Sequence, residues 1–219
     1  MDFEAVSDQS IAVGLIENPC CWALRDFAKQ VPADQAIVEL GVFKGRSTGW
    51  LAYGSHTGNG AHVFSVDPWE SGVVPAGYET HAPTVVEYVK SETREAWEAH
   101  VERVGAQDCV SPIQLTAVEA AVEWSGPKVG LLFHDALHRK EDVEADLRAW
   151  LPHLADDAVI VVHDVGDSRL GPDVEAGVRA VFGRRKCWKS REIVPWVKVN
   201  PDGTPRPMGR RGFLVLRLS

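Results

Sequence analysis

The 219-residue sequence lacks any apolar run long enough to cross a membrane, which takes about 18 consecutive apolar residues. Its first residues, Met1 to Ala5, carry neither the basic nor the apolar stretch of a secretory signal, so none is expected. The four cysteines show no C-x-x-C spacing, and Cys20 and Cys21 are adjacent. This pattern is typical of reduced thiols in a cytoplasmic protein rather than of a zinc site or a disulfide framework.

The 13 prolines and 19 glycines are too few for a disordered or fibrous protein. The 23 basic and 31 acidic residues give a net charge of −8, so nucleic acid and anionic membranes are unfavoured partners. Because a typical domain has about 150 residues, residues 1–219 are expected to form a single domain.

Short runs that are apolar on both faces recur along the chain, as in buried parallel strands covered by helices. Helical patterns separate them, chiefly at 93–104 and 140–154. The alternation predicts an α/β fold with a doubly wound, mostly parallel, seven-stranded sheet. The first five strands are expected at 36–40, 62–66, 112–116, 129–133 and 158–162.

The two ends of the chain and one internal stretch differ from this alternation. After a helical pattern at 173–183, strands at 192–199 and 213–218 are joined by a link too short for a crossover, so an antiparallel C-terminal pair is expected. Residues 1–33 are expected to form a helical extension. The stretch 70–91, with its glycines and prolines, is expected to be a lid-like loop.

A turn rich in small residues follows the first expected strand and opens a helix. Gly41 and Gly45 let the backbone bend tightly and approach a ligand, and Ser47 and Thr48 add hydroxyls at the helix start. The G-x-x-x-G spacing differs from the G-x-G-x-x-G of dinucleotide sites. Glu39, just before the turn, favours a cationic ligand over a pyrophosphate. A tight turn with no ligand is the alternative.

Asp67 closes the second expected strand, next to the first in the predicted sheet. A carboxylate at that position can accept hydrogen bonds from ribose hydroxyls. The alternative is that Asp67 only caps its strand. The glycine turn and this acid, at the ends of adjacent strands, together indicate a nucleoside-containing ligand.

These residues resemble the class I S-adenosylmethionine-dependent methyltransferases. Glu39-x-Gly41-x-x-x-Gly45 matches their glycine-loop motif, and Asp67 matches their ribose-binding acid. The segment from Val129 to Asp164 further resembles a bacterial subfamily of small-molecule O-methyltransferases. In that subfamily the fourth strand ends in Asp-x-x-His, the next helix in Trp-Leu-Pro and the fifth strand in His-Asp. The resemblance covers about residues 34–218 and implies a Rossmann-like methyltransferase fold.

The resemblance also implies S-adenosylmethionine as the cofactor. Trp69, after the ribose acid, is placed to flank adenine or to roof the acceptor pocket, although simple packing is an alternative. The family often carries an aspartate near Thr116 and Ala117 that contacts adenine, and this chain has none there. The expected cofactor-binding residues are Glu39, Gly41, Phe43, Gly45, Ser47, Thr48, Asp67, Trp69, Thr116 and Asp135.

Acidic and imidazole side chains end the fourth and fifth expected strands, where such folds bind ligands. Related metal-dependent O-methyltransferases place an Asp at the first of these ends and two adjacent ligands at the second. The resemblance therefore implies a divalent metal held by Asp135, His163 and Asp164, although His163 departs from the usual acidic or amide ligand. An all-oxygen site would suit magnesium, whereas a histidine ligand favours manganese, iron or zinc.

His138 lies three residues after Asp135, where some of these enzymes carry a lysine base. An imidazole titrates near neutral pH and can take the proton of an acceptor hydroxyl. The expected catalytic residues are therefore His138 and Asp135. Alternatively, His138 caps a helix, His163 is a core residue and Asp164 only caps a turn.

The resulting hypothesis is a cytoplasmic, bacterial enzyme that methylates a hydroxyl of a small molecule, such as a sugar, phenol or natural product. Homo-oligomer formation stays open. Two rivals remain: a methyltransferase acting on RNA or protein, and a non-catalytic protein that binds S-adenosylmethionine. The net charge of −8 weighs against RNA, as does Asp135-Ala136-Leu137-His138 where an Asn-Pro-Pro-Tyr-type tetrapeptide would stand.

Overall fold

The computed structural model describes most of the chain, with gaps. Of the strand residues at 188–199 and 205–212, only the backbone is described. The predicted lid-like loop lies outside the described residues apart from Glu70 and Val86. The described residues are 1–7, 16, 18–70, 86, 93–167, 169–183, 188–199 and 205–218.

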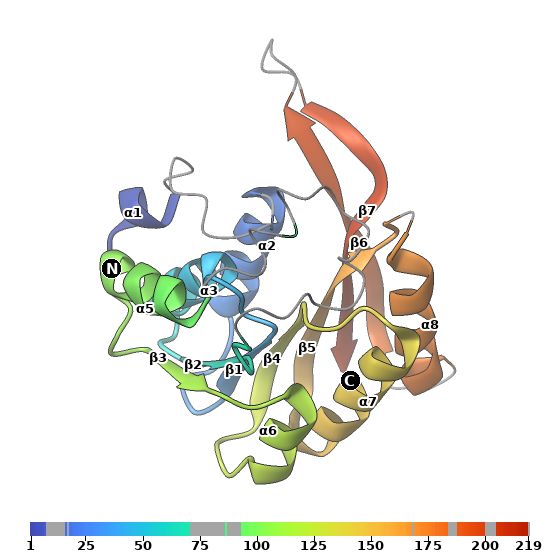
Figure 1. Ribbon diagram of the computed structural model, residues 1–219, viewed down its shortest axis with the longest axis horizontal. Helices are drawn as coiled ribbons and strands as arrows, with labels where there is room; N and C mark the ends of the chain where they lie inside the picture. Colours follow the sequence, from blue (N-terminus) through green and yellow to red (C-terminus); the bar gives the residue numbers. More distant parts are fainter. Residues whose placement is uncertain are drawn as a thin grey trace.

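A seven-stranded sheet with the order β3-β2-β1-β4-β5-β7-β6 forms the centre of the fold (Figure 1). The first five strands are parallel, and β7 runs antiparallel to both β5 and β6. The predicted mostly parallel sheet with an antiparallel C-terminal strand is therefore confirmed. The strands are β1 (Ala36–Leu40), β2 (His62–Val66), β3 (Val110–Ile113), β4 (Val129–His134), β5 (Leu154–Val165), β6 (Trp188–Val199) and β7 (Pro205–Leu218).

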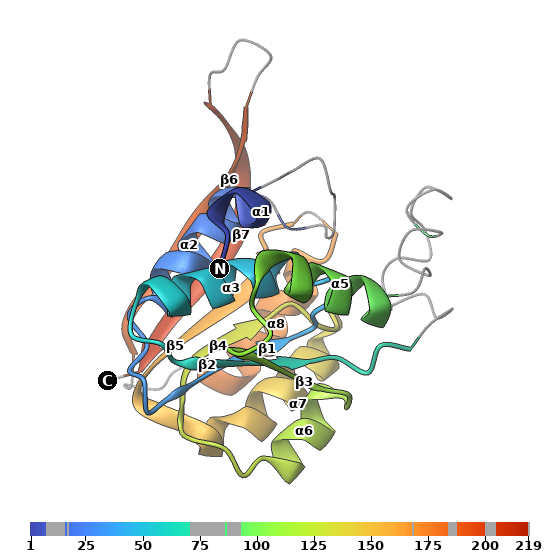
Figure 2. The same ribbon diagram turned by 90° about the vertical axis from the view of Figure 1, so that its left-hand side faces the viewer.

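Helices cover both faces of the sheet, as a doubly wound fold requires. Figure 2 shows α3 and α5 on one face and α6 and α7 on the other. The helices of the first face are α1 (Phe3–Ser7), α2 (Asn18–Ala28), α3 (Arg46–Thr57) and α5 (Arg94–Val104). Those of the second are α6 (Ala117–Glu123), α7 (Lys140–Trp150) and α8 (Gly171–Phe182). None of the described helices is long and apolar enough to cross a membrane.

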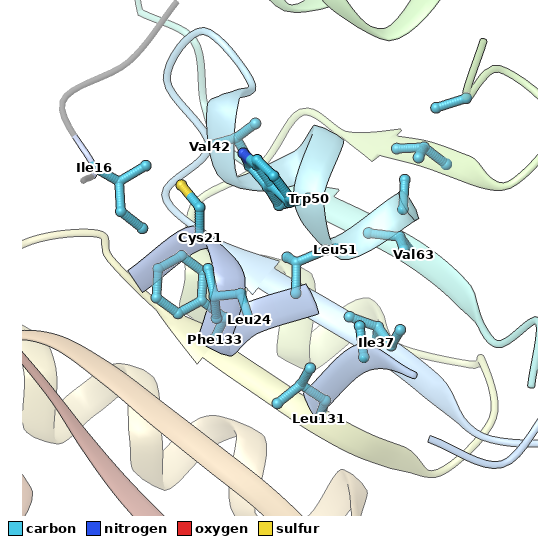
Figure 3. Close-up of a cluster of buried hydrophobic side chains, with 14 of the residues drawn as sticks. Ile16, Cys21, Leu24, Ile37, Val42, Trp50, Leu51, Val63, Leu131 and Phe133 are labelled. Carbon is cyan, nitrogen blue, oxygen red and sulfur yellow. The ribbon is translucent and has the colours of Figure 1, made fainter. Parts of the chain in front are cut away.

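Two apolar clusters, one on each face of the sheet, hold the layers together. In the first, Leu24 of α2 and Leu51 of α3 pack over Ile37 and Leu131 of the sheet (Figure 3). All four side chains are fully buried. Burying a leucine or isoleucine side chain contributes about 2 kcal/mol each, so this packing fixes α3 and the turn before it against β1.

Some element boundaries differ from the predicted ones. The third strand is β3, Val110–Ile113, rather than 112–116, because Thr116 instead begins α6 with a capping box to Glu119. The helix predicted at 140–154 ends at Trp150, and Pro152 lies in a short 3-10 turn that leads into β5.

Candidate active site

A cavity of about 360 Å³ opens at the carboxyl ends of the central parallel strands. This is the edge of an open α/β sheet where ligands bind, next to the point at which the strand order reverses between β1 and β4. It is lined by Ile16, Gly41, Val42, Phe43, Arg46, Ser47, Val66, Asp67, Pro68, Trp69, Glu70, Thr93, Thr116, Ala117, Asp135, Ala136, Leu137, His138 and Asp146.

The glycine turn needs its glycines for both backbone conformation and space. Gly41 and Gly45 have φ angles of 80° and 90°, in the left-handed region that favours glycine. A Cβ atom on Gly41 would lie 2.3 Å from the carbonyl oxygen of Asp135. The turn therefore packs directly against the end of β4 and brings Asp135 to the cavity wall.

Asp67 ties the glycine turn to the end of β2. Its Oδ2 accepts hydrogen bonds from the backbone N–H groups of Val42 and Phe43, at 2.8 and 3.0 Å. Its Oδ1 accepts one from the backbone N–H of Trp69, at 2.7 Å. Each carboxylate oxygen has two lone pairs, so Asp67 keeps acceptor capacity for hydroxyl groups in the cavity that it lines.

Glu39 lies beneath the turn rather than in the cavity wall. It is fully buried, and it accepts hydrogen bonds from the hydroxyls of Ser47, Thr48 and Ser65. Burial raises the pKa of Glu39 to about 7, although the three hydroxyls favour the ionised form. Glu39 thus fixes the first turn of α3 to the sheet.

Two aromatic side chains close one side of the cavity. Trp69 is 6% exposed, and its Nε1 donates to the carbonyl of Phe43 at 3.1 Å. Its ring lies 5.4 Å from that of Trp97, with the Arg94 guanidinium 4.5 Å from the centre of the Trp69 ring. Trp97 Nε1 also donates to Thr48 Oγ1 at 3.3 Å, so the hydroxyl of Thr48 is used in contacts within the protein rather than with a ligand.

Backbone strain is concentrated at this site. Among the described residues, Phe43, Trp69 and Asp164 are the non-glycine residues with positive φ, at 54°, 46° and 57°. Such conformations cost about 1–3 kcal/mol each and collect at functional sites, where surrounding contacts hold them. Two of the three line the cavity, and Asp164 contacts a residue that does.

Four titratable side chains meet beside the cavity, from the ends of β4 and β5. His138 Nε2 lies 2.8 Å from Asp164 Oδ2. His163 Nδ1 lies 2.9 Å from Asp135 Oδ1 and 3.4 Å from Asp164 Oδ2. Asp135 is 23% exposed, whereas the other three side chains are at least nine-tenths buried. We call these four residues the carboxylate–imidazole cluster.

Opposite charges within this cluster stabilise one another. Burial disfavours a protonated His163, but the carboxylates of Asp135 and Asp164 outweigh burial and raise the pKa of His163 well above its usual value. Burial likewise disfavours an ionised Asp164, but His163 and His138 outweigh it and lower the pKa of Asp164. The geometry therefore favours a charged His163 that holds two carboxylates in place, with His138 at the cavity.

One grouping of the described residues has the spacing of metal ligands. Asp135, His138 and Asp164 each offer a ligand atom, and these atoms lie within 4.8 Å of one another. His163, predicted as a ligand in place of His138, instead contacts both carboxylates through Nδ1. Two carboxylates and one imidazole suit manganese, iron or zinc better than magnesium.

The predicted site residues divide into three groups. Gly41, Phe43, Ser47, Asp67, Trp69, Thr116, Asp135 and His138 line the cavity. His163 and Asp164 contact Asp135 or His138 from the adjacent strand. Glu39, Gly45 and Thr48 support the turn without lining the cavity.

Three charged residues in the cavity wall, Arg46, Glu70 and Asp146, have no counterpart among the predicted site residues, and two of them come from helices. Arg46 begins α3, and its Nη2 donates to Asn18 Oδ1 at 2.6 Å. Its Nε is buried without a hydrogen-bond partner among the described residues. Asp146 lies on α7, beneath the sheet. The spacing of helix residues alone could not reveal either, because each reaches the cavity only through the packing of two helices.

The sheet order and the cavity at the reversal of strand order define a doubly wound α/β protein with a ligand-sized site at the switch point of its sheet. A family model described as "Methyltransferase domain" matches residues 38–165, more than half of the chain. The chain belongs to this methyltransferase family. No curated protein matches the sequence.

Solved structures share the fold over almost the whole chain. Cofactor-bound Rv0187 from MTB has a TM-score of 0.65 at 19% identity, over 98% of this chain and 86% of that one. The O-methyltransferase TomG from Streptomyces achromogenes, in complex with SAM, has a TM-score of 0.64 and 17% sequence identity, over 99% of this chain and 86% of that one. An O-methyltransferase from Bacillus cereus, in complex with SAH, has a TM-score of 0.62 and 14% sequence identity, over 99% of this chain and 88% of that one. At these identities, the likeness establishes the fold.

Proposed function

We propose that this protein transfers the methyl group of S-adenosylmethionine to a hydroxyl group of a small molecule. The observation that carries the proposal is one cavity that joins a ribose-binding carboxylate, Asp67, to an imidazole paired with a buried carboxylate, His138 and Asp164. The family supplies the methyltransferase class. The O-methyltransferases of the same fold that hold SAM or SAH support the cofactor and the oxygen acceptor.

The lining of the cavity fits the parts of S-adenosylmethionine. Asp67 offers acceptors for the ribose hydroxyls, and the tight turn at Gly41 allows close backbone approach. Asp135 places negative charge on the wall that a sulfonium or ammonium group would face. When bound, the cofactor supplies an electrophilic methyl group on a positively charged sulfur.

Arg46 would hold the carboxylate of the methionyl part. A guanidinium with a buried, unpartnered Nε in a cavity wall calls for an anionic ligand, and it stands at the positive end of the α3 dipole. Asp135 and Arg46 together would match the ammonium and carboxylate of an amino acid. This assignment adds Arg46 to the proposed cofactor-binding residues, which the sequence motifs alone did not include.

His138 is the proposed general base. It lines the cavity, its Nε2 lies 2.8 Å from the Asp164 carboxylate, and a neutral imidazole nitrogen can take a proton from an acceptor hydroxyl. Asp164 orients the ring and stabilises the imidazolium that forms. The carboxylate of Asp135, which His163 holds in place, would stabilise the positive charge on the sulfur of the methyl donor.

A divalent metal is a second use of the same residues. Asp135, His138 and Asp164 would hold it, and the ion would act as a Lewis acid that lowers the pKa of an acceptor hydroxyl. A metal bound through His138 excludes that residue as the base, so the two roles are alternatives. Chelation decides between them. A metal-independent enzyme keeps full activity after dialysis against EDTA, whereas a metal enzyme loses activity and regains it with Mn²⁺.

A small acceptor suits the size and charge of the site. The net charge of −8 opposes binding to RNA, and the proposed compartment is the cytoplasm, where the buried Cys20 and Cys21 would stay reduced. A methyltransferase of RNA predicts salt-dependent RNA binding, which a titration with RNA at varied salt tests. Absence of such binding supports the small-molecule acceptor.

Calorimetric titration with S-adenosylhomocysteine tests the cofactor, and a mass-spectrometric screen of phenols, sugars and sugar nucleotides with S-adenosylmethionine tests the reaction. We expect binding in the micromolar range and a product heavier by one methylene unit. A folded protein that binds neither S-adenosylmethionine nor S-adenosylhomocysteine would overturn the proposal. Binding without turnover of any acceptor in the screen would favour a non-catalytic, cofactor-binding role.

A further inference from the structure

Asp146 is a buried carboxylate in the cavity wall, on the opposite side of the sheet from Arg46. It lies on α7, one helical turn before Trp150, whose Nε1 donates to the carbonyl of Ala117 at 2.9 Å. This contact holds α7 against the start of α6, where Ala117 also lines the cavity. Asp146 therefore lines the cavity from α7, near the start of α6.

Only part of the acceptor capacity of this carboxylate is used. Asp146 Oδ2 lies 3.0 Å from His134 Nε2, and the two residues are 6% and 3% exposed. Among the residues that the structure describes, no other donor reaches Asp146. Asp146 lines the cavity, and the lone pairs that remain on its carboxylate can accept a hydrogen bond from a ligand there.

The geometry of the cavity tells which part of the cofactor lies there. Asp67, at the end of β2, anchors the ribose, and the methyl group must face the carboxylate–imidazole cluster at the ends of β4 and β5. The base must then extend from the ribose away from that cluster, towards the start of α6, where Thr116 and Ala117 line the cavity. Val66, Ala117 and Ala136 give the cavity an apolar lining that suits the faces of a purine.

We infer that Asp146 accepts a hydrogen bond from the 6-amino group of adenine and so selects adenine at this position. This inference rests on the proposed function, since it concerns the base of S-adenosylmethionine. Adenine offers a donor at its 6-position, whereas hypoxanthine offers an oxo group that a carboxylate repels. His134 keeps the carboxylate in place and leaves one oxygen for the base.

The test compares S-adenosylhomocysteine with its deaminated analogue, S-inosylhomocysteine, by calorimetric titration. Loss of a hydrogen bond to a buried charge predicts that the wild type prefers the adenosyl compound by about 10- to 100-fold. In Asp146→Asn, an amide can accept from an amino group or donate to an oxo group. Binding of the adenosyl compound should weaken while binding of the inosyl compound improves, so the preference falls to about threefold or less.

Opposite changes for the two ligands separate recognition from structural damage, which would weaken both. Glu141→Gln is the matched control, because this exposed acid lies on the same helix and should leave both affinities unchanged. Equal affinity of the wild type for the two ligands would overturn the inference and leave the proposed function intact. So would an unchanged preference in the Asp146 variant. No binding of either ligand by the wild type would instead overturn the proposed function.

Discussion

His138 Nε2 lies 2.8 Å from Asp164 Oδ2, and each side chain is 10% exposed. The two residues come from different strand ends, and Asp164 reaches this position only with a positive φ of 57°. A strained carboxylate that holds a cavity-lining imidazole is the arrangement of a general base and its orienting partner. The nearby carboxylate of Asp164 would stabilise the imidazolium that the proposed reaction forms on His138.

His138→Gln should therefore lower kcat by about 10²- to 10⁴-fold, the usual range for a general base. Asp164→Asn should lower kcat as well, because it removes the negative charge that stabilises the imidazolium of His138. Affinity for S-adenosylhomocysteine should stay within about threefold in both variants. The measurements are turnover of the acceptor that the screen identifies and calorimetry of the cofactor product. His56→Gln, on the exposed end of α3, is the control. Full kcat in the His138 variant would exclude this base.

Gly41 and Gly60 have the same φ of 80° but different surroundings. A Cβ atom on Gly41 would lie 2.3 Å from the Asp135 carbonyl oxygen, whereas one on Gly60 would meet nothing within 4 Å. Gly60→Ala should cost about 1–2 kcal/mol of unfolding free energy through φ alone. Gly41→Ala should cost clearly more and also weaken cofactor binding, because the end of β4 must move. Urea denaturation and calorimetry measure both effects, and equal losses in the two variants would contradict this account of the turn.

The sequence predicts the strands, the glycine turn and the acid after β2 because each is a local pattern. A buried parallel strand appears in the sequence as a run of apolar residues, and a turn with positive φ appears as a glycine. Long-range packing determines what the sequence could not predict. Glu39 faces three hydroxyls rather than a ligand, which depends on how α3 lies on β1. Asp146 reaches the cavity only because α7 packs against α6.

Arg46→Ala should weaken binding of S-adenosylhomocysteine by about 10- to 100-fold, since a charged hydrogen bond to the carboxylate is lost. Binding of 5′-methylthioadenosine, which lacks the amino-acid part, should stay unchanged. Arg46→Lys should recover part of the affinity through its charge. Asn18→Ala, which removes the partner of Nη2, separates a structural role from ligand binding. Equal losses for both ligands would show that Arg46 acts through the fold.

Two buried groups give stability opposite dependences on pH. Burial raises the pKa of Glu39 to about 7 from its ordinary 4.5, so the folded state binds the extra proton between these values, and stability falls as pH rises through that window. Burial lowers the pKa of His100 to about 4 from 6.5, with Arg103 and Arg46 adding to the shift. The unfolded state then binds the extra proton, and stability rises with pH from about 4 to 6.5.

The opposite pH dependences of stability from Glu39 and His100 nearly cancel in the wild type. Replacing one of these residues should therefore expose the pH dependence that comes from the other. Relative to the wild type, Glu39→Gln should gain stability as pH rises from about 4.5 to 7, by up to about 3 kcal/mol. His100→Gln should change the other way, losing relative stability as pH rises from about 4 to 6.5. Urea denaturation at half-unit steps from pH 4.5 to 7.5 gives both differences. A constant difference between Glu39→Gln and the wild type across this range would mean that folding leaves the pKa of Glu39 unchanged, because the hydroxyls of Ser47, Thr48 and Ser65 offset the effect of burial.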